Sequence, residues 1–100
     1  MSIKSVCYIL YSKILNRYYV GATHENVEER LEKHNKHGYG KHRYTAVTND
    51  WEIYLILETK DYSHAIRVER KIKSMKSRVY IENLKKYPEL QQKVLYQTST

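Results

Sequence analysis

The sequence predicts a single α+β domain, in which helices pack on a three-stranded, mostly antiparallel sheet in the order β-β-α-β-α-α-α. Two observations carry this prediction. Two short apolar runs flank a turn near the N-terminus, and a segment with strand-like alternation follows at mid-chain. Segments with helical periodicity and helix start signals occupy most of the second half. A chain of 100 residues supports one core, and no repeat or linker divides it. We therefore expect residues 1–100 to form one domain.

The N-terminal segment is predicted to form a β-hairpin. Residues 6–11 and 18–20 are apolar runs on either side of a turn-like stretch at 13–17. Four of the chain's eleven tyrosines lie in residues 7–21, and the chain contains no phenylalanine. A hairpin places tyrosines of its two strands side by side, so the repeated choice of a ring with a hydroxyl suggests a use for that hydroxyl.

A helix is expected to follow, and then a long loop. Asn26 and Glu29 have the spacing of a capping box before a helix over residues 27–36, which we expect to end near Gly38. Residues 37–50 contain two glycines and show no sustained periodicity. A loop of this length in a small domain is often functional.

Residues 51–58 show the clearest strand pattern in the chain. Four apolar residues are expected to share one face of this strand: Trp51, Ile53, Leu55 and Leu57. The next helix is expected from His64 to Lys76 with Ser63 as its cap, and its predicted buried stripe consists of Ala65, Val68, Ile72 and Met75.

Two more helices are expected near the C-terminus. Ser77 can cap a third helix that runs to about Lys86. Pro88 suits the first turn of a last helix over residues 88–97, with Tyr87 pushed toward an extended conformation.

The charge of +7 is concentrated in one segment. Residues 60–87 hold nine of the eighteen Lys and Arg residues but only three of the eleven Asp and Glu residues. A concentrated basic surface attracts polyanions, and contact with phosphates releases condensed counterions. Nucleic acid is therefore one interpretation of this segment, and a solvated helix face that aids solubility is the other.

The composition also indicates where the protein works. No apolar run approaches the roughly 20 residues that cross a bilayer, and the N-terminus lacks the pattern of a secretory signal. Cys7, the single cysteine, cannot form an internal disulfide and reads as a small buried strand residue. We expect a cytoplasmic protein.

Three polar residues fall beside apolar helix stripes. Arg30 and His34 border the stripe of the first helix, and Glu69 lies close to Ala65 on the second. A partly buried carboxylate needs a cation as partner. An ion pair with Lys73, four residues on, is the simplest partner.

Several short motifs occur in a fixed order over about residues 4–87. They are Val6-Cys7-Tyr8, Tyr19-Val20-Gly21, Arg30 with His34-Asn35, Arg43-Tyr44-Thr45 before a W-x-x-x-L strand, and Glu69 in E-x-x-x-K. This ordered set resembles the GIY-YIG endonuclease superfamily. The closest likeness is to small single-domain (URI-type) members, which are similar to the N-terminal nuclease domain of the DNA-repair protein UvrC. Val-Cys-Tyr stands where the family has Gly-Ile-Tyr, but the tyrosine supplies the reactive group.

The resemblance implies a metal-dependent endonuclease that hydrolyses phosphodiester bonds in DNA. Glu69 would be the single protein ligand of Mg²⁺ or Mn²⁺, and Arg30 would stabilise the transition state. Tyr8 would position or deprotonate the attacking water, and Tyr19 would hold the site by its hydroxyl. His34 would act as base, bind phosphate, or serve as a structural helix-end residue. Gly21 and Asn83 complete the family pattern.

The remaining functional predictions concern nucleic-acid contacts. We expect them at a basic and aromatic loop and along the basic segment, namely at Tyr39, Lys41, Arg43, Tyr44, Lys71, Lys73, Lys76 and Arg78. One hundred residues offer little surface for reading a long sequence, which favours recognition of a DNA structure by a monomer. RNA also fits these contacts. The rival interpretations are an inactive nucleic-acid-binding module of the same fold and a basic protein-interaction domain. A zinc site at His34 and His37 lacks a third convergent ligand.

Overall fold

A computed structural model describes residues 4–36 and 48–99 of the chain. Its elements confirm the predicted class and order. They are β1 (Val6–Ser12), β2 (Arg17–Thr23), α1 (Val27–Asn35), β3 (Glu52–Glu58), α2 (Tyr62–Met75), α3 (Arg78–Lys86) and α4 (Pro88–Gln97). In the described part of the chain, no helix has the length and apolar character needed to span a membrane.

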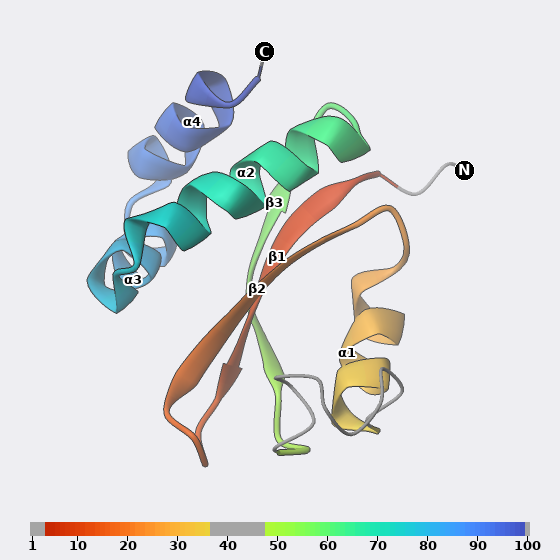
Figure 1. Cartoon of the computed structure of the whole chain (residues 1–100). Helices are drawn as coiled ribbons and strands as arrows, with labels where there is room; N and C mark the ends of the chain where they lie inside the picture. Colours follow the sequence, from red (N-terminus) through yellow and green to blue (C-terminus); the bar gives the residue numbers. More distant parts are fainter. Residues whose placement is uncertain (1–3, 37–47, 100) are drawn as a thin grey trace.

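The sheet separates two hydrophobic layers. Its strand order is β2-β1-β3, and both pairings are antiparallel, so β1 is central. In Figure 1, α1 lies on one side of the sheet, and α2, α3 and α4 lie on the other. Since successive residues of a strand point to opposite faces, Cys7 and Ile9 pack with α2, α3 and α4, whereas Tyr8 and Leu10 pack toward α1. The fold thus turns Tyr8 into the α1 layer.

The β1–β2 hairpin has the predicted form, with a turn fixed by two special features. Asn16 adopts a left-handed conformation with φ of 52°, which asparagine tolerates better than most residues. Asp50 reaches the turn from outside the hairpin, because its carboxylate accepts hydrogen bonds from Ser12 Oγ at 2.6 Å and from the main-chain N–H of Ile14 at 2.9 Å. With a third bond from Thr48, these contacts lower the pKa of Asp50 to about 2.

The pairing of β3 corrects one prediction. Ile9 of β1 pairs with Leu55, but the next residue, Leu10, pairs with Ile53, which leaves Tyr54 as an extra residue in a β-bulge. The bulge reverses the alternation along β3. Trp51 and Ile53 therefore pack in the α1 layer, while Leu55 and Leu57 pack in the opposite one. The expectation that all four share a face was wrong.

Helix α2 begins earlier than predicted. The side chain of Asp61, not of Ser63, caps the helix by accepting a hydrogen bond from the N–H of His64 at 2.8 Å. His64 is buried in this first turn, where its ring contacts the carbonyl oxygen of Leu95 in α4 at 2.9 Å. Met75, expected in the buried stripe, is exposed, because the helix ends there and passes to Lys76 with a left-handed φ of 48°.

The other helix boundaries follow the predicted signals. The side chain of Asn26 accepts a hydrogen bond from the N–H of Glu29 at the start of α1, which ends one residue before the predicted Lys36. Ser77 caps α3 in the same way, and Pro88 occupies the first turn of α4 behind an extended Tyr87.

Candidate active site

A buried pair of polar side chains joins β1 to α1. The hydroxyl of Tyr8 lies 3.0 Å from Nε2 of His34. Tyr8 has no exposed surface, and His34 is 3% exposed. A buried histidine needs a polar partner, because losing water without one costs free energy. Tyr8 supplies that partner, so the last turn of α1 is tied to the middle of the sheet.

Tyr19 and Gly21 of β2 complete the surroundings of this pair. The Tyr19 ring centre lies 4.8 Å from that of His34 and 6.2 Å from that of Tyr8. Gly21 lies opposite Tyr8 in the hairpin register. A Cβ atom at Gly21 would lie 2.7 Å from both Cζ and Oη of Tyr8 and 3.0 Å from Cε2 of Tyr19. Glycine is therefore required at this position by the close approach of two tyrosines.

Arg30 lies on α1 one turn before His34, on the side that borders the sheet. Its side chain is 22% exposed, and its Nη1 atom is 3.8 Å from Oε1 of Glu25. The same carboxylate is 3.6 Å from the ammonium group of Lys33. These separations are longer than hydrogen bonds, so Glu25 neutralises the guanidinium without fixing it as a bidentate pair would.

Glu69 of α2 is partly buried, as predicted, and it pairs with Lys73. Its Oε2 atom lies 2.7 Å from Nζ of Lys73, and its side chain is 18% exposed. The ammonium group of Lys73 is also 5.9 Å from the centre of the Tyr19 ring. Lys73 therefore contacts both the carboxylate and one of the two tyrosines, which links α2 to the α1 side of the sheet across the edge at β2.

The Cys7 thiol is buried and feels the charges of Glu69 and Lys73. Burial raises the pKa of the Cys7 thiol, the carboxylate of Glu69 raises it further, and Lys73 opposes the increase. Cys7 is fully buried, which confirms the prediction of a structural strand residue. A buried thiol with a raised pKa is a poor nucleophile.

Glu69 also decides whether the site fits a divalent metal ion. Within residues 4–36 and 48–99, no cluster of three or more His, Cys, Asp or Glu side chains could hold a metal. Mg²⁺ commonly binds through one or two carboxylates and completes its shell with water and phosphate oxygens. A single, mostly buried carboxylate on a regular helix fits that donor set.

The predicted nucleic-acid contacts divide into three groups. Lys73, Lys76 and Arg78 line one groove beside β2, whereas Lys71 lines a separate cavity between α2 and α4. Four predicted residues lie outside the described part of the chain: Tyr39, Lys41, Arg43 and Tyr44.

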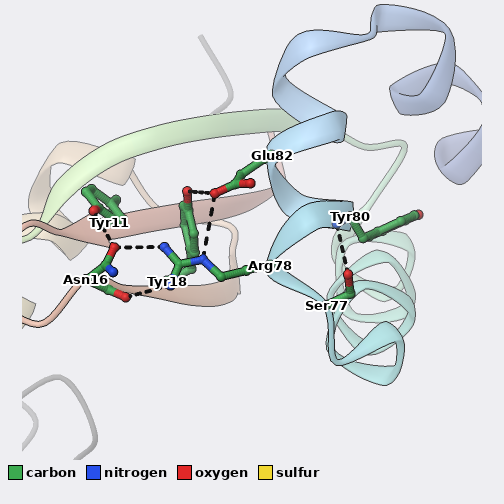
Figure 2. A network of polar contacts seen from close by, with 7 residues as sticks. All are labelled: Tyr11, Asn16, Tyr18, Ser77, Arg78, Tyr80 and Glu82. Carbon is green, nitrogen blue, oxygen red and sulfur yellow. Dashed lines mark hydrogen bonds and ion pairs between the residues drawn. The ribbon is translucent and has the colours of Figure 1, made fainter.

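Arg17 and Tyr18 also line the groove, although neither was among the predicted nucleic-acid contacts. Arg78 bonds the hairpin turn at Asn16, and Tyr18 donates a hydrogen bond to Glu82 at 3.3 Å (Figure 2). Asn83 lies on α3, where its carbonyl oxygen accepts the N–H of Tyr87. In the sequence, Arg17 is a cation beside a predicted hairpin turn. Nothing in that local pattern indicates that the turn lies against α3.

Comparison with known proteins bears on the family prediction. Neither the curated proteins nor the solved structures include a match to this chain. Residues 4–86 match the family described as the GIY-YIG catalytic domain, and that span agrees with the predicted 4–87. The likeness to the UvrC nuclease domain stays a prediction, since the match is to the catalytic domain in general. The hairpin strands carry Tyr8 and Tyr19, and the match covers most of the chain, so the protein belongs to the GIY-YIG family.

Proposed function

We propose that this protein is a metal-dependent endonuclease that hydrolyses phosphodiester bonds in DNA. A GIY-YIG catalytic domain implies nuclease-type chemistry. The observation that carries the proposal is the buried Tyr8–His34 pair beside Tyr19, because it combines a hydroxyl with a titratable ring in a site that a simple scaffold would fill with apolar residues.

Tyr8 and His34 would form a proton relay. A phenol with an ordinary pKa of about 10 is a weak base at neutral pH, whereas the ordinary pKa of imidazole is about 6.5. In the relay, the Tyr8 oxygen takes a proton from the attacking water as its own proton passes to Nε2 of His34. The ring already carries a proton on Nδ1, so it becomes an imidazolium with one proton on each nitrogen. The 3.0 Å contact supports the transfer from Tyr8 to His34.

The other residues would bind and orient the phosphate. Arg30 would stabilise the extra negative charge of the pentavalent transition state, a role suited to its permanently charged guanidinium. Glu69 would hold Mg²⁺ or Mn²⁺, which would supply Lewis-acid polarisation of a phosphoryl oxygen. Lys73 would neutralise that carboxylate in the metal-free protein through its 2.7 Å contact. Tyr19, which is more exposed than Tyr8, would hold the phosphate or a water by its hydroxyl.

One specific observation favours the rival function, an inactive module that only binds nucleic acid. The Glu69 carboxylate already has a cation partner in Lys73 at 2.7 Å, as a purely structural ion pair would. The buried Tyr8–His34 pair argues for the enzyme, because a binding module gains nothing from a shielded hydroxyl.

A cleavage assay separates the two functions. Purified protein would be incubated with flapped, branched, single-stranded and duplex DNA, and with single-stranded RNA, in Mg²⁺, in Mn²⁺ and in a chelator. We expect metal-dependent cleavage with a preference for flaps or branches over plain duplex, consistent with a role in DNA repair. Binding without cleavage of any substrate would instead assign the inactive module.

The single, buried Cys7 supports the proposal that the enzyme works in the reducing cytoplasm.

A further inference from the structure

A groove of about 490 Å³ lies along the edge of β2, between that strand, the end of α2 and the start of α3. Two tyrosines and four cations are among its lining residues, namely Tyr18, Tyr19, Arg17, Lys73, Lys76 and Arg78. None of the described residues that line it is acidic. A concave surface with one sign of charge concentrates its field on an anionic ligand.

The groove is continuous with the candidate active site through two shared residues. Tyr19 lies 4.8 Å from the ring of His34, and Lys73 bonds to Glu69 at 2.7 Å. Both residues also line the groove. A polymer strand that crosses the site between Tyr19 and Glu69 therefore meets the groove as it leaves.

The wall of the groove is held in place by polar contacts that Figure 2 shows. Arg78 donates to the main-chain oxygen of Asn16 at 3.1 Å and to its side-chain oxygen at 2.8 Å. Its guanidinium carbon lies 5.3 Å from the centre of the Tyr18 ring, and its Nε is 3.7 Å from Glu82. The Tyr18 ring packs edge-on against Tyr54 at 4.9 Å. Side chains fixed before binding lose less entropy when a ligand arrives.

Lys76 occupies a position that stability alone does not explain. It links α2 to α3 in the left-handed conformation, which glycine and asparagine adopt at lower cost than lysine. Its side chain is exposed at the groove. A lysine at this junction places a cation at the groove, although glycine or asparagine would adopt the left-handed conformation at lower cost.

We propose that this groove binds the sugar–phosphate backbone of the substrate strand next to the scissile phosphate. The inference rests on the proposed function for the identity of the substrate, a nucleic acid. Arg17, Lys76 and Arg78 would contact successive phosphates, and the phenol of Tyr18 would face the sugars and bases. These contacts position the strand and carry no sequence information.

The structure also supplies a matched control surface. Lys71 is on the same helix as Lys73 but lines the separate cavity between α2 and α4, together with Lys93. The basic segment is therefore divided between two surfaces, and the proposal assigns backbone binding to one of them.

The test compares two double variants with wild-type protein. The groove variant is Arg17→Gln with Lys76→Asn, in which asparagine preserves the left-handed turn. The control variant is Lys71→Gln with Lys93→Gln, which removes the same charge elsewhere. Binding of a fluorescein-labelled single strand and of the matching duplex is measured over a salt series in a chelator, so that no cleavage occurs. Thermal melts check that both variants fold.

We expect the plot of log affinity against log salt to become shallower only in the groove variant. Each lost phosphate contact reduces the slope by about 0.7 for single strands and about 0.9 for duplex. Equal slopes in the groove and control variants would overturn the proposal. In the cleavage assay the groove variant should raise KM and keep kcat, and a loss confined to kcat would also contradict a binding role.

The two proposals can fail separately. If the salt dependence of binding is weaker only in the groove variant but wild-type protein cleaves no substrate, the proposed nuclease activity is wrong and the proposed binding groove stands. If wild-type protein cleaves DNA and both double variants bind DNA like wild type, the proposed nuclease activity stands and the proposed binding groove is wrong.

Discussion

The hydroxyl of Tyr8 and Nε2 of His34 lie 3.0 Å apart inside the layer between β1 and α1. Besides His34 and Tyr19, this layer contains the buried apolar side chains of Val6, Leu10 and Trp51. A phenylalanine and a leucine would fill the same space without the cost of burying two polar groups. Packing alone would therefore favour apolar side chains at these two positions, and the polar pair indicates a chemical role. Substitutions test its effect on cleavage and on stability.

Tyr8→Phe removes the hydroxyl and keeps the ring. We expect the cleavage rate to fall about 10²- to 10⁴-fold, the usual contribution of a positioned acid or base. The free energy of unfolding should fall by about 1–3 kcal/mol, because the buried hydrogen bond between Tyr8 and His34 is lost. Single-turnover cleavage and urea unfolding measure the two effects.

The double variant Tyr8→Phe with His34→Gln shows whether the two residues act as a unit. If they form one relay, its cleavage rate should be close to that of the slower single variant. Losses that multiply would mean independent roles and would end the relay mechanism.

Arg30→Ala should affect the transition state more than binding. We expect a rate loss of about 10²- to 10³-fold with only a modest change in DNA affinity. Arg30→Lys is the matched control, because it keeps the charge and loses the planar fork. Equal losses of rate and affinity in Arg30→Ala would make Arg30 a ground-state phosphate contact.

Gly21→Ala tests the close approach of the two tyrosines. The backbone of Gly21 is not in the left-handed region, so the cost of alanine is steric. The new Cβ would lie 2.7 Å from the phenol end of Tyr8, which is fully buried and has little room to move. We expect a loss of about 1–3 kcal/mol in unfolding free energy, the range for overpacking, together with loss of cleavage. An alanine variant as stable and active as wild type would show that the packing here is loose.

Much of the fold could be predicted from local signals, and the exceptions have long-range causes. Signals within a few residues encode the hairpin, the helix caps at Asn26 and Ser77, and the proline start of the last helix. The bulge at Tyr54 arises from pairing with β1, far away in the chain, so the alternating sequence of β3 gave no sign of it. Ser63 and Asp61 are both good caps, and the sequence alone does not rank them.

The sequence predicted the residues of the candidate site but not the contacts between them. The motif order identified Tyr8, Tyr19, Arg30 and Glu69, and helix geometry predicted that Glu69 would be partly buried. The partner of His34 is a strand residue 26 positions earlier, and helix periodicity cannot reveal such a contact. For the same reason Arg17 and Tyr18 were missed, since only the tertiary fold brings the hairpin turn against α3.

Asp50 should make the hairpin sensitive to acid. Its pKa in the folded protein is about 2, held down first by the hydrogen bond from Ser12, whereas an unfolded aspartate titrates near about 3.9. A lowered pKa stabilises the fold fully above about pH 4, and this contribution is lost as the pH falls toward 2. Asp50→Asn should therefore be less stable than wild type at neutral pH, with a difference that shrinks between pH 4 and 2.

Urea unfolding at a series of pH values measures that difference. Asn49→Ala, next in the chain and without a carboxyl group, is the control and should differ from wild type by the same amount at every pH. A gap between Asp50→Asn and wild type that stays constant from pH 7 to 2 would show that Asp50 does not control the acid response.

Glu69→Gln separates a metal ligand from a structural ion pair. An i, i+4 pair with a half-exposed lysine contributes only about 0.2–0.5 kcal/mol, so the unfolding free energy should change little. Cleavage should be abolished. Metal that binds the folded protein raises its melting temperature, so Mg²⁺ or Mn²⁺ should stabilise wild-type protein and leave Glu69→Gln unchanged.

Lys73→Gln is the matched control, because it breaks the same ion pair and leaves the carboxylate. If Glu69 binds the metal, Lys73→Gln should keep the metal-dependent rise in melting temperature, and removal of the competing ammonium group should make that rise larger at low metal concentration. If Glu69 serves only to hold Lys73, the two variants should behave alike in melting and in cleavage. Full activity of Glu69→Gln at saturating Mg²⁺ would rule out a one-carboxylate metal site and remove the main support for a metal-dependent nuclease.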